Sequence, residues 1–144
     1  MSASNSLETA VLLLYFNNTN HANVGDATGV RGSSTAGSFY VSLHTADPGE
    51  TGTAVTNEAA YTNYARVAVA RSSAGWTVSG NTVSNAALIS FPACGASGAT
   101  ITHFGIVETS SGAGALHFSG TCSLTVSSGI TPQFAIGALT VTAD

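Results

Sequence analysis

The clearest alternation of hydrophobic and polar positions lies at residues 39–44, which read FYVSLH. Because successive side chains of a strand point to opposite faces, this pattern predicts a half-buried strand with one apolar face and one solvated face. The following Asp47-Pro48-Gly49 predicts a turn, since Pro fixes φ and Gly accepts positive φ. A second strand is expected over residues 64–69, joined to the first by a surface loop.

A hairpin is the best-defined local prediction. Residues 76–79 (WTVS) and 82–85 (TVSN) flank the dipeptide Gly-Asn, which is typical of a two-residue hairpin turn of type II′. This pairing would place Val78 opposite Val83 on one face of the sheet. The second strand of the hairpin is expected to run on to Phe91, because Val83, Ala87, Ile89 and Phe91 keep the same parity. Further short runs with strand patterning follow at residues 101–108, 115–119, 121–127 and 133–142.

Together these runs define the expected fold class. Counted from Phe39, they give about eight short strands separated by turns, which is the signature of a β-sandwich or jelly roll. The sequence therefore predicts an all-β, single-domain β-sandwich or jelly roll over residues 39–144, preceded by a short N-terminal helix.

The N-terminal segment reads SNSLETAVLLLYFN at residues 4–17 and is the one helix candidate. Asn5 and Glu8 have the spacing of a capping box. Its apolar side is wide, however, and residues 11–16 form a continuous apolar run that is equally compatible with a strand. Whether the segment packs within its own chain or against a neighbour stays open.

Residues 17–38 show no lasting period and predict a long loop or arm, in which Arg31 is the only cation. We therefore divide the chain into a helix and extended arm at residues 1–38 and a β domain at residues 39–144. The expected contacts with a partner or a second subunit are Leu7, Val11, Leu14, Phe16, Arg31 and Arg66.

Composition narrows the classes of partner. The chain is 44% hydrophobic and only 7% charged, it has no Lys, and its formal charge is −4. Disordered chains combine low hydrophobicity with high charge, so a folded domain is favoured. A neutral surface suits burial against copies of itself or another protein, with a soluble monomer as the alternative. Three Arg and no Lys argue against nucleic-acid binding.

No cofactor, membrane span or disulfide is expected. The apolar run at residues 11–16 is too short to cross a membrane and lacks the basic flank of a signal peptide. Without such a signal, Cys94 and Cys122 are expected to remain reduced.

Catalytic and metal-binding patterns are weak. The absence of Lys excludes a P-loop or a Schiff base. His44, Asp47 and Glu50 have ligand types for a divalent ion, but a histidine at a strand end beside a turn is the favoured interpretation. A second set, His103, Glu108 and His117, is looser, because His103 and Glu108 have opposite parity on their strand. We therefore expect no catalytic residue and no metal site.

Arg66 is of interest because cations are so few. It could pair with Glu50 or Glu58 and fix the loop before it, or with a carboxylate of another subunit. The local pair is favoured. Trp76 is expected in the core, with an interface or a sugar as alternatives.

Two sequence strings, LHTADPGETG at residues 43–52 and YARVAV at residues 64–69, followed by Trp76, resemble a family of small virion proteins of tailed bacteriophages. The resemblance covers most of the chain from about Tyr40 to Asp144. It implies a structural protein of the particle and not an enzyme, and it carries no catalytic motif.

The resemblance leaves two possible positions of the protein on the virion. In the favoured one, the protein is a capsid decoration or cement protein that binds the major capsid protein as homotrimers, because low charge suits many neutral interfaces. In the alternative, it is a tail-fibre or baseplate module that recognises the host surface. Receptor-binding modules are expected to expose aromatic residues in their loops, and these loops contain almost none.

Overall fold

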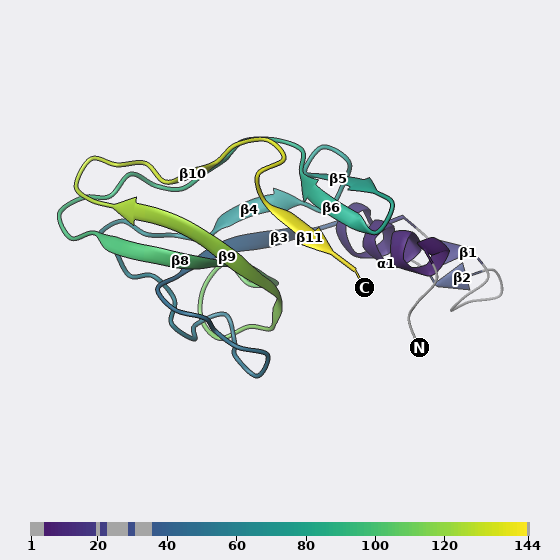
Figure 1. The fold of residues 1–144 in the computed structure, drawn as a ribbon, viewed down its shortest axis with the longest axis horizontal. Coiled ribbons are helices and arrows are strands. Elements are labelled where there is room, and N and C mark those ends of the chain that lie inside the picture. Colours follow the sequence, from purple (N-terminus) through teal and green to yellow (C-terminus); the bar gives the residue numbers. More distant parts are fainter. Residues whose placement is uncertain (1–4, 20, 23–28, 31–35, 144) are drawn as a thin grey trace. The chain divides into compact units, whose positions relative to one another are not determined.

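The computed structural model describes residues 5–19, 21–22, 29–30 and 36–143. It consists of one helix followed by strands that form antiparallel sheets (Figure 1). The predicted fold class, all-β with a short N-terminal helix, is confirmed. Arg31 lies outside the described residues.

The elements have the following bounds: α1 Asn5–Asn17, β1 His21–Ala22, β2 Gly29–Val30, β3 Ser38–His44, β4 Val67–Ala70, β5 Trp76–Ser79, β6 Thr82–Asn85, β7 Ile89–Ser90, β8 Ala99–Val107, β9 Leu116–Val126, β10 Gln133–Phe134 and β11 Thr140–Thr142. Their order in the sheets is β4-β3-β8-β9, β11-β6-β5, β10-β7 and β1-β2. Residues 115–127, expected as two strands, are largely taken up by the single long strand β9. The run at 133–142 instead forms two short strands.

The chain divides into two compact units. The first comprises Met1–Ser38, Val69–Leu88 and Phe134–Asp144, and the second comprises Phe39–Ala68 and Ile89–Gln133.

In the first unit, the predicted hairpin is confirmed. Val78 pairs with Val83 across β5 and β6, and Gly80 occupies the turn with φ 61°, a conformation that Gly adopts without a steric penalty. On the other side of β6, Val141 of β11 pairs with the same Val83.

Helix α1 packs within its own chain. Residues 11–16 are helical, so the strand alternative is wrong. Phe16 and Trp76 are both 0% exposed, and their ring centroids lie 4.7 Å apart in an edge arrangement. Arg71 donates hydrogen bonds to the carbonyl oxygens of Leu14 and Tyr15, where the last turn of a helix leaves carbonyls unpaired.

In the second unit, β3 pairs with β8 in a regular antiparallel register from Tyr40 opposite Val107 to His44 opposite His103. The prediction of a half-buried strand is wrong at the end of β3, where Ser42 and His44 are both 0% exposed. Their polar groups are satisfied internally, because Ser42 Oγ lies 2.8 Å from His44 Nε2 and His44 Nδ1 lies 2.8 Å from the Thr56 carbonyl oxygen.

Candidate interaction site

The loop between β3 and β4 is held by a buried ion pair in the second unit. Arg66 donates to both carboxylate oxygens of Glu58, from Nε at 2.6 Å and from Nη2 at 2.7 Å. The side chains of Arg66 and Glu58 are only 2% and 16% exposed. Hydrogen bonding to Glu58 raises the pKa of Arg66 above its ordinary value. The favoured local pairing of Arg66 is therefore the one observed, with Glu58 as the partner.

The same guanidinium also holds a second loop. Arg66 Nη1 donates to the carbonyl and hydroxyl oxygens of Thr109, both at 2.9 Å, and Nη2 donates to the Gly112 carbonyl at 2.9 Å. The Tyr64 hydroxyl donates to Glu58 at 3.0 Å and accepts from the Leu43 amide at 3.0 Å. Burial raises the pKa of Tyr64. All five N–H groups of Arg66 thus have an acceptor, which satisfies a charge that would be costly to bury alone.

The turn after β3 has its own local bonds. The Gly49 amide donates to Asp47 Oδ1 at 2.9 Å, and Gly49 has φ 69°. Asn57 Nδ2 donates to the Asp47 carbonyl at 2.9 Å and so fastens the far side of the loop. The predicted turn at Asp47-Pro48-Gly49 is confirmed.

The candidate metal ligands do not converge. His44 uses both ring nitrogens in hydrogen bonds to Ser42 and Thr56. Burial lowers the pKa of His44 and so favours the neutral imidazole. Within the described residues, no three His, Cys, Asp or Glu side chains gather closely enough to hold a metal ion. Cys94 and Cys122 are free thiols.

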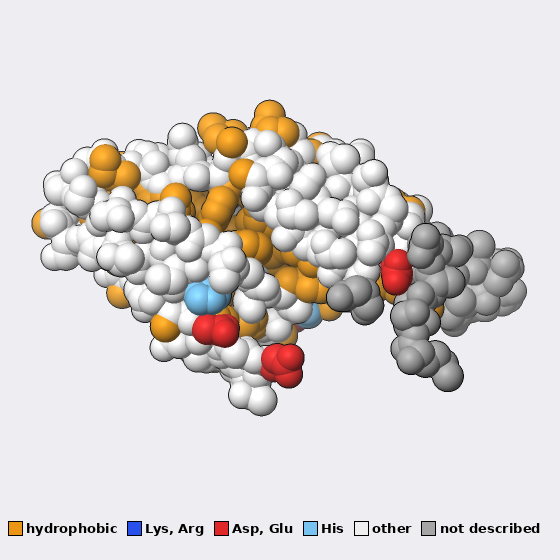
Figure 2. Space-filling model, in the orientation of Figure 1, with side chains coloured by type: hydrophobic (Ala, Val, Ile, Leu, Met, Phe, Trp, Pro, Cys, Tyr) orange, Lys and Arg blue, Asp and Glu red, His pale blue; other side chains and the backbone are white. Residues whose placement is uncertain are grey.

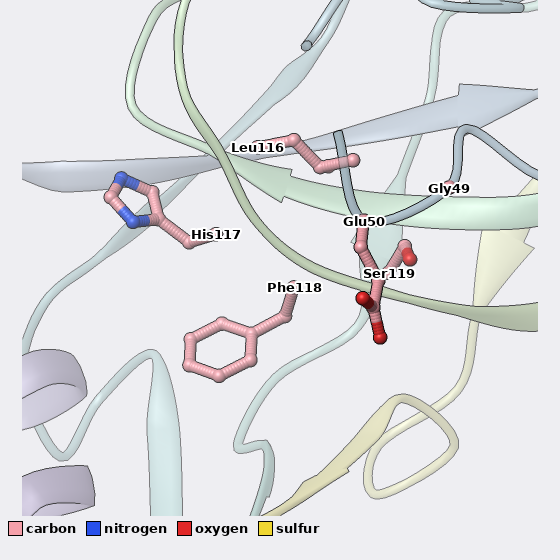
Figure 3. A pocket seen from close by; sticks show the side chains of 6 residues that line it. All are labelled: Gly49, Glu50, Leu116, His117, Phe118 and Ser119. Carbon is pink, nitrogen blue, oxygen red and sulfur yellow. The ribbon is translucent and has the colours of Figure 1, made fainter. Parts of the chain in front are cut away.

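A pocket of about 250 Å³ lies between this loop and the beginning of β9 (Figure 3). The loop contributes Gly49 and Glu50, and the strand contributes the four residues 116–119. In Figure 3 the rings of His117 and Phe118 point away from the Glu50 carboxylate. The pocket therefore offers a carboxylate and a hydroxyl to a polar ligand, but no acid and base aimed at one point.

His117 has a different carboxylate neighbour. Its Nε2 lies 3.6 Å from Glu108 Oε2, and its ring centroid lies 5.5 Å from that of Phe39. Glu108 Oε1 accepts a hydrogen bond from the Ala115 amide at 3.2 Å. The looser set expected from the sequence is thus only partly assembled, because Glu108 is paired with His117 and His103 bonds to Thr102 at 2.9 Å.

The predicted contact residues on α1 fall into two groups. Leu7 and Val11 are 45% and 42% exposed, and Leu14 is half-buried. Phe16, by contrast, is enclosed in its own chain against Trp76. Sequence reasoning did not find the pocket beside β9, since Glu50 and Ser119 are far apart in the chain and share no motif.

Residues 2–142 match the sequence profile of the Gp80 family, described as podophage GP4 fiber I protein gp80. The chain belongs to this family. The predicted class, a structural protein of a bacteriophage virion, is thereby confirmed. No curated protein matches the sequence. Among the described residues, no helix has the length and apolarity needed to cross a bilayer.

Proposed function

We propose that this member of the Gp80 family is a subunit of a podophage fibre and has a structural, non-catalytic role. The observation that carries the proposal is the family match over residues 2–142, because the family is described by a fibre protein. The match spans both compact units, so the proposal concerns the chain as a whole.

The surface supports a protein that is buried against neighbours in a particle. The chain has three Arg, no Lys, and seven Asp and Glu residues. No Arg is visible on the face drawn in Figure 2. Ordinary domains carry about 25% charged residues, which keep them soluble and separate. A surface with so little charge suits repeated neutral contacts.

The fixed loops of the second unit support the same role. Arg66 joins the loop after β3 to the loop after β8 through hydrogen bonds to Glu58, Thr109 and Gly112. Loops held in one conformation lose little conformational entropy when a partner docks on them. Such loops suit a permanent contact in an assembled particle.

Capsid decoration is the second candidate, and the low charge is the observation that favours it. In that placement the partner is the major capsid protein, and the protein binds the shell as homotrimers. The two placements differ in the number of copies that each particle must contain, because a shell component is repeated with the capsid subunit and a fibre is not.

The test is the copy number per purified virion, measured by quantitative mass spectrometry against the major capsid protein. A handful of copies per particle is expected for a fibre. A ratio near one copy per capsid subunit would overturn the fibre proposal and support decoration. Electron cryomicroscopy of virions labelled with a specific antibody fragment then locates the protein, and label at the tail is expected.

A further inference from the structure

Strand β9 forms one edge of the four-stranded sheet and is unusually long for an edge (Figure 1). It has 11 residues. The other strands that end the two larger sheets have 4, 4 and 3 residues in β4, β5 and β11. Short edge strands are one way in which proteins prevent unwanted pairing, because an edge presents unpaired N–H and C=O groups. In the described structure β9 departs from that pattern.

The residues of β9 do not protect it from pairing with another strand either. Its sequence, LHFSGTCSLTV, contains no Lys, Arg, Asp, Glu or Pro. Its ladder with β8 has two register shifts, between Ile101 and His103 and between Ile106 and Val107. Such bulges increase the local twist but add no repelling charge.

In the part of the chain that the structure describes, the residues just before β9 pair with the loop after β3. Thr53 bridges Ala115, and the Ala54 amide donates to the Gly114 carbonyl at 3.0 Å. The pocket beside Glu50 extends along the strand as far as Ser119. Beyond this point, the stretch from Ser119 to Thr125 has β8 as its neighbour in the sheet.

We propose that the edge from Ser119 to Thr125 pairs antiparallel with the same edge of a second copy of this chain. The occupant must be an extended strand, because only a strand supplies alternating N–H and C=O groups along the edge. A second β9 matches the length of this edge, whereas the other edge strands named above are too short. Two uncharged strands also meet without electrostatic repulsion.

The exposed side chains of this stretch are compatible with pairing to a second copy. The exposed positions are all hydroxyl residues, Ser119, Thr121, Ser123 and Thr125. The register shift between Ile101 and His103 places a bulge within this stretch, so Ser119 and Thr121 share one face of the sheet and Thr125 lies on the other face. On both faces the exposed side chains of the stretch are thus uncharged hydroxyl residues, which can form hydrogen bonds across a paired edge.

The proposal requires a twofold dimer, in which one residue of the stretch lies opposite its own copy. It is independent of the position of the protein on the virion. It differs from the homotrimer expected from the sequence, since edge-to-edge pairing of identical strands about a twofold axis closes at two copies.

The first experiment is sedimentation of the full chain and of the double variant Thr121→Lys/Ser123→Lys. We expect a dimer for the natural chain and a monomer for the variant, because charged lysines on an edge strand prevent edge-to-edge pairing. The control is Thr77→Lys/Thr142→Lys, which adds the same charge at exposed positions of β5 and β11 and should remain a dimer. Circular dichroism and a thermal melt confirm that both variants are folded.

A trimer, a monomer at the highest soluble concentration, or a dimer that survives the lysines at 121 and 123 would overturn the proposal. If the lysine variant fails to fold, a cysteine scan tests the pairing of the two β9 edges instead. On a Cys122→Ser background, single cysteines are placed at 119, 121, 123, 124 and 125, with the natural chain supplying position 122. We expect mild oxidation to crosslink one position strongly and its neighbours progressively less. A flat or absent profile contradicts the pairing.

Discussion

Arg66 and Glu58 form a two-point ion pair, with Nε 2.6 Å from Oε1 and Nη2 2.7 Å from Oε2, in a site that leaves the arginine side chain 2% exposed. Removing one partner of a buried pair leaves the other charge uncompensated, which typically costs about 3 to 5 kcal/mol. We expect Arg66→Ala to lower the free energy of unfolding in urea by an amount in that range. Arg66→Lys should also destabilise, because an ammonium cannot reproduce the planar fork. A change below about 0.5 kcal/mol for Arg66→Ala, as at ordinary surface positions, would show that the pair is dispensable.

His44 should make stability depend on pH. Burial lowers its pKa from the ordinary value of 6.5, so below that value the unfolded chain takes up the proton more readily than the folded one. The contribution of His44 to the free energy of unfolding is therefore full above about pH 6.5. It falls as the pH drops below that value and stops changing once the pH is below the pKa of His44 in the folded protein. Urea unfolding between neutral and mildly acidic pH measures this slope. His44→Gln should reduce the slope, and an unchanged slope would assign it to other groups.

Phe16 should be essential to the first unit, whereas Val11 should not. Phe16 is 0% exposed and contacts the Trp76 ring, and replacing a buried Phe with Ala typically costs about 3 to 5 kcal/mol. Val11 is 42% exposed on the same helix, so Val11→Ala should change stability by about 0.5 kcal/mol or less. Thermal unfolding followed by Trp76 fluorescence compares the two. Equal effects would contradict the packing of α1 within its own chain.

Asn85 should be needed to hold the turns at the ends of β6 and β11. It is 1% exposed, and its Nδ2 donates to the carbonyls of Ala87 and Ala135, each at 2.8 Å. Its Oδ1 accepts from the Leu139 amide at 2.9 Å. Each buried polar group left without a partner costs about 1 to 3 kcal/mol, so Asn85→Ala should destabilise by about 3 kcal/mol or more.

Asn85→Asp is the matched variant, since it keeps the acceptor and the shape and removes both donors. We expect a loss of stability at neutral pH, where the carboxylate would face two carbonyl oxygens, and partial recovery as acid protonates it. If Asn85→Asp and the natural chain have the same free energy of unfolding at neutral pH, the two hydrogen bonds donated by Asn85 do not contribute to stability.

Local sequence determined the hairpin and the turns. The Gly-Asn dipeptide between two strand-forming runs pairs Val78 with Val83 as predicted, and Asp47-Pro48-Gly49 forms the expected turn. These features depend on φ preferences and on bonds between residues close in the chain, so they can be inferred without knowing the rest of the fold.

Tertiary structure decided which polar residues are buried. Alternation placed His44 on a solvated face, yet its ring is enclosed and bonded to Thr56, which belongs to the following loop. From the sequence, either Glu50 or Glu58 could pair with Arg66, and in the structure the partner is Glu58. Arg66 also donates hydrogen bonds to Thr109 and Gly112, which lie in a loop distant in the sequence.

The sequence by itself determined an all-β protein with one helix and few charged residues, because composition and periodicity depend only on the residues present. Only the tertiary structure decided that α1 packs within its own chain, that Arg66 joins two loops, and that β9 is a long edge. Those features arise from contacts between residues far apart in the sequence, whose pairing is set by which surfaces the whole chain can bury together.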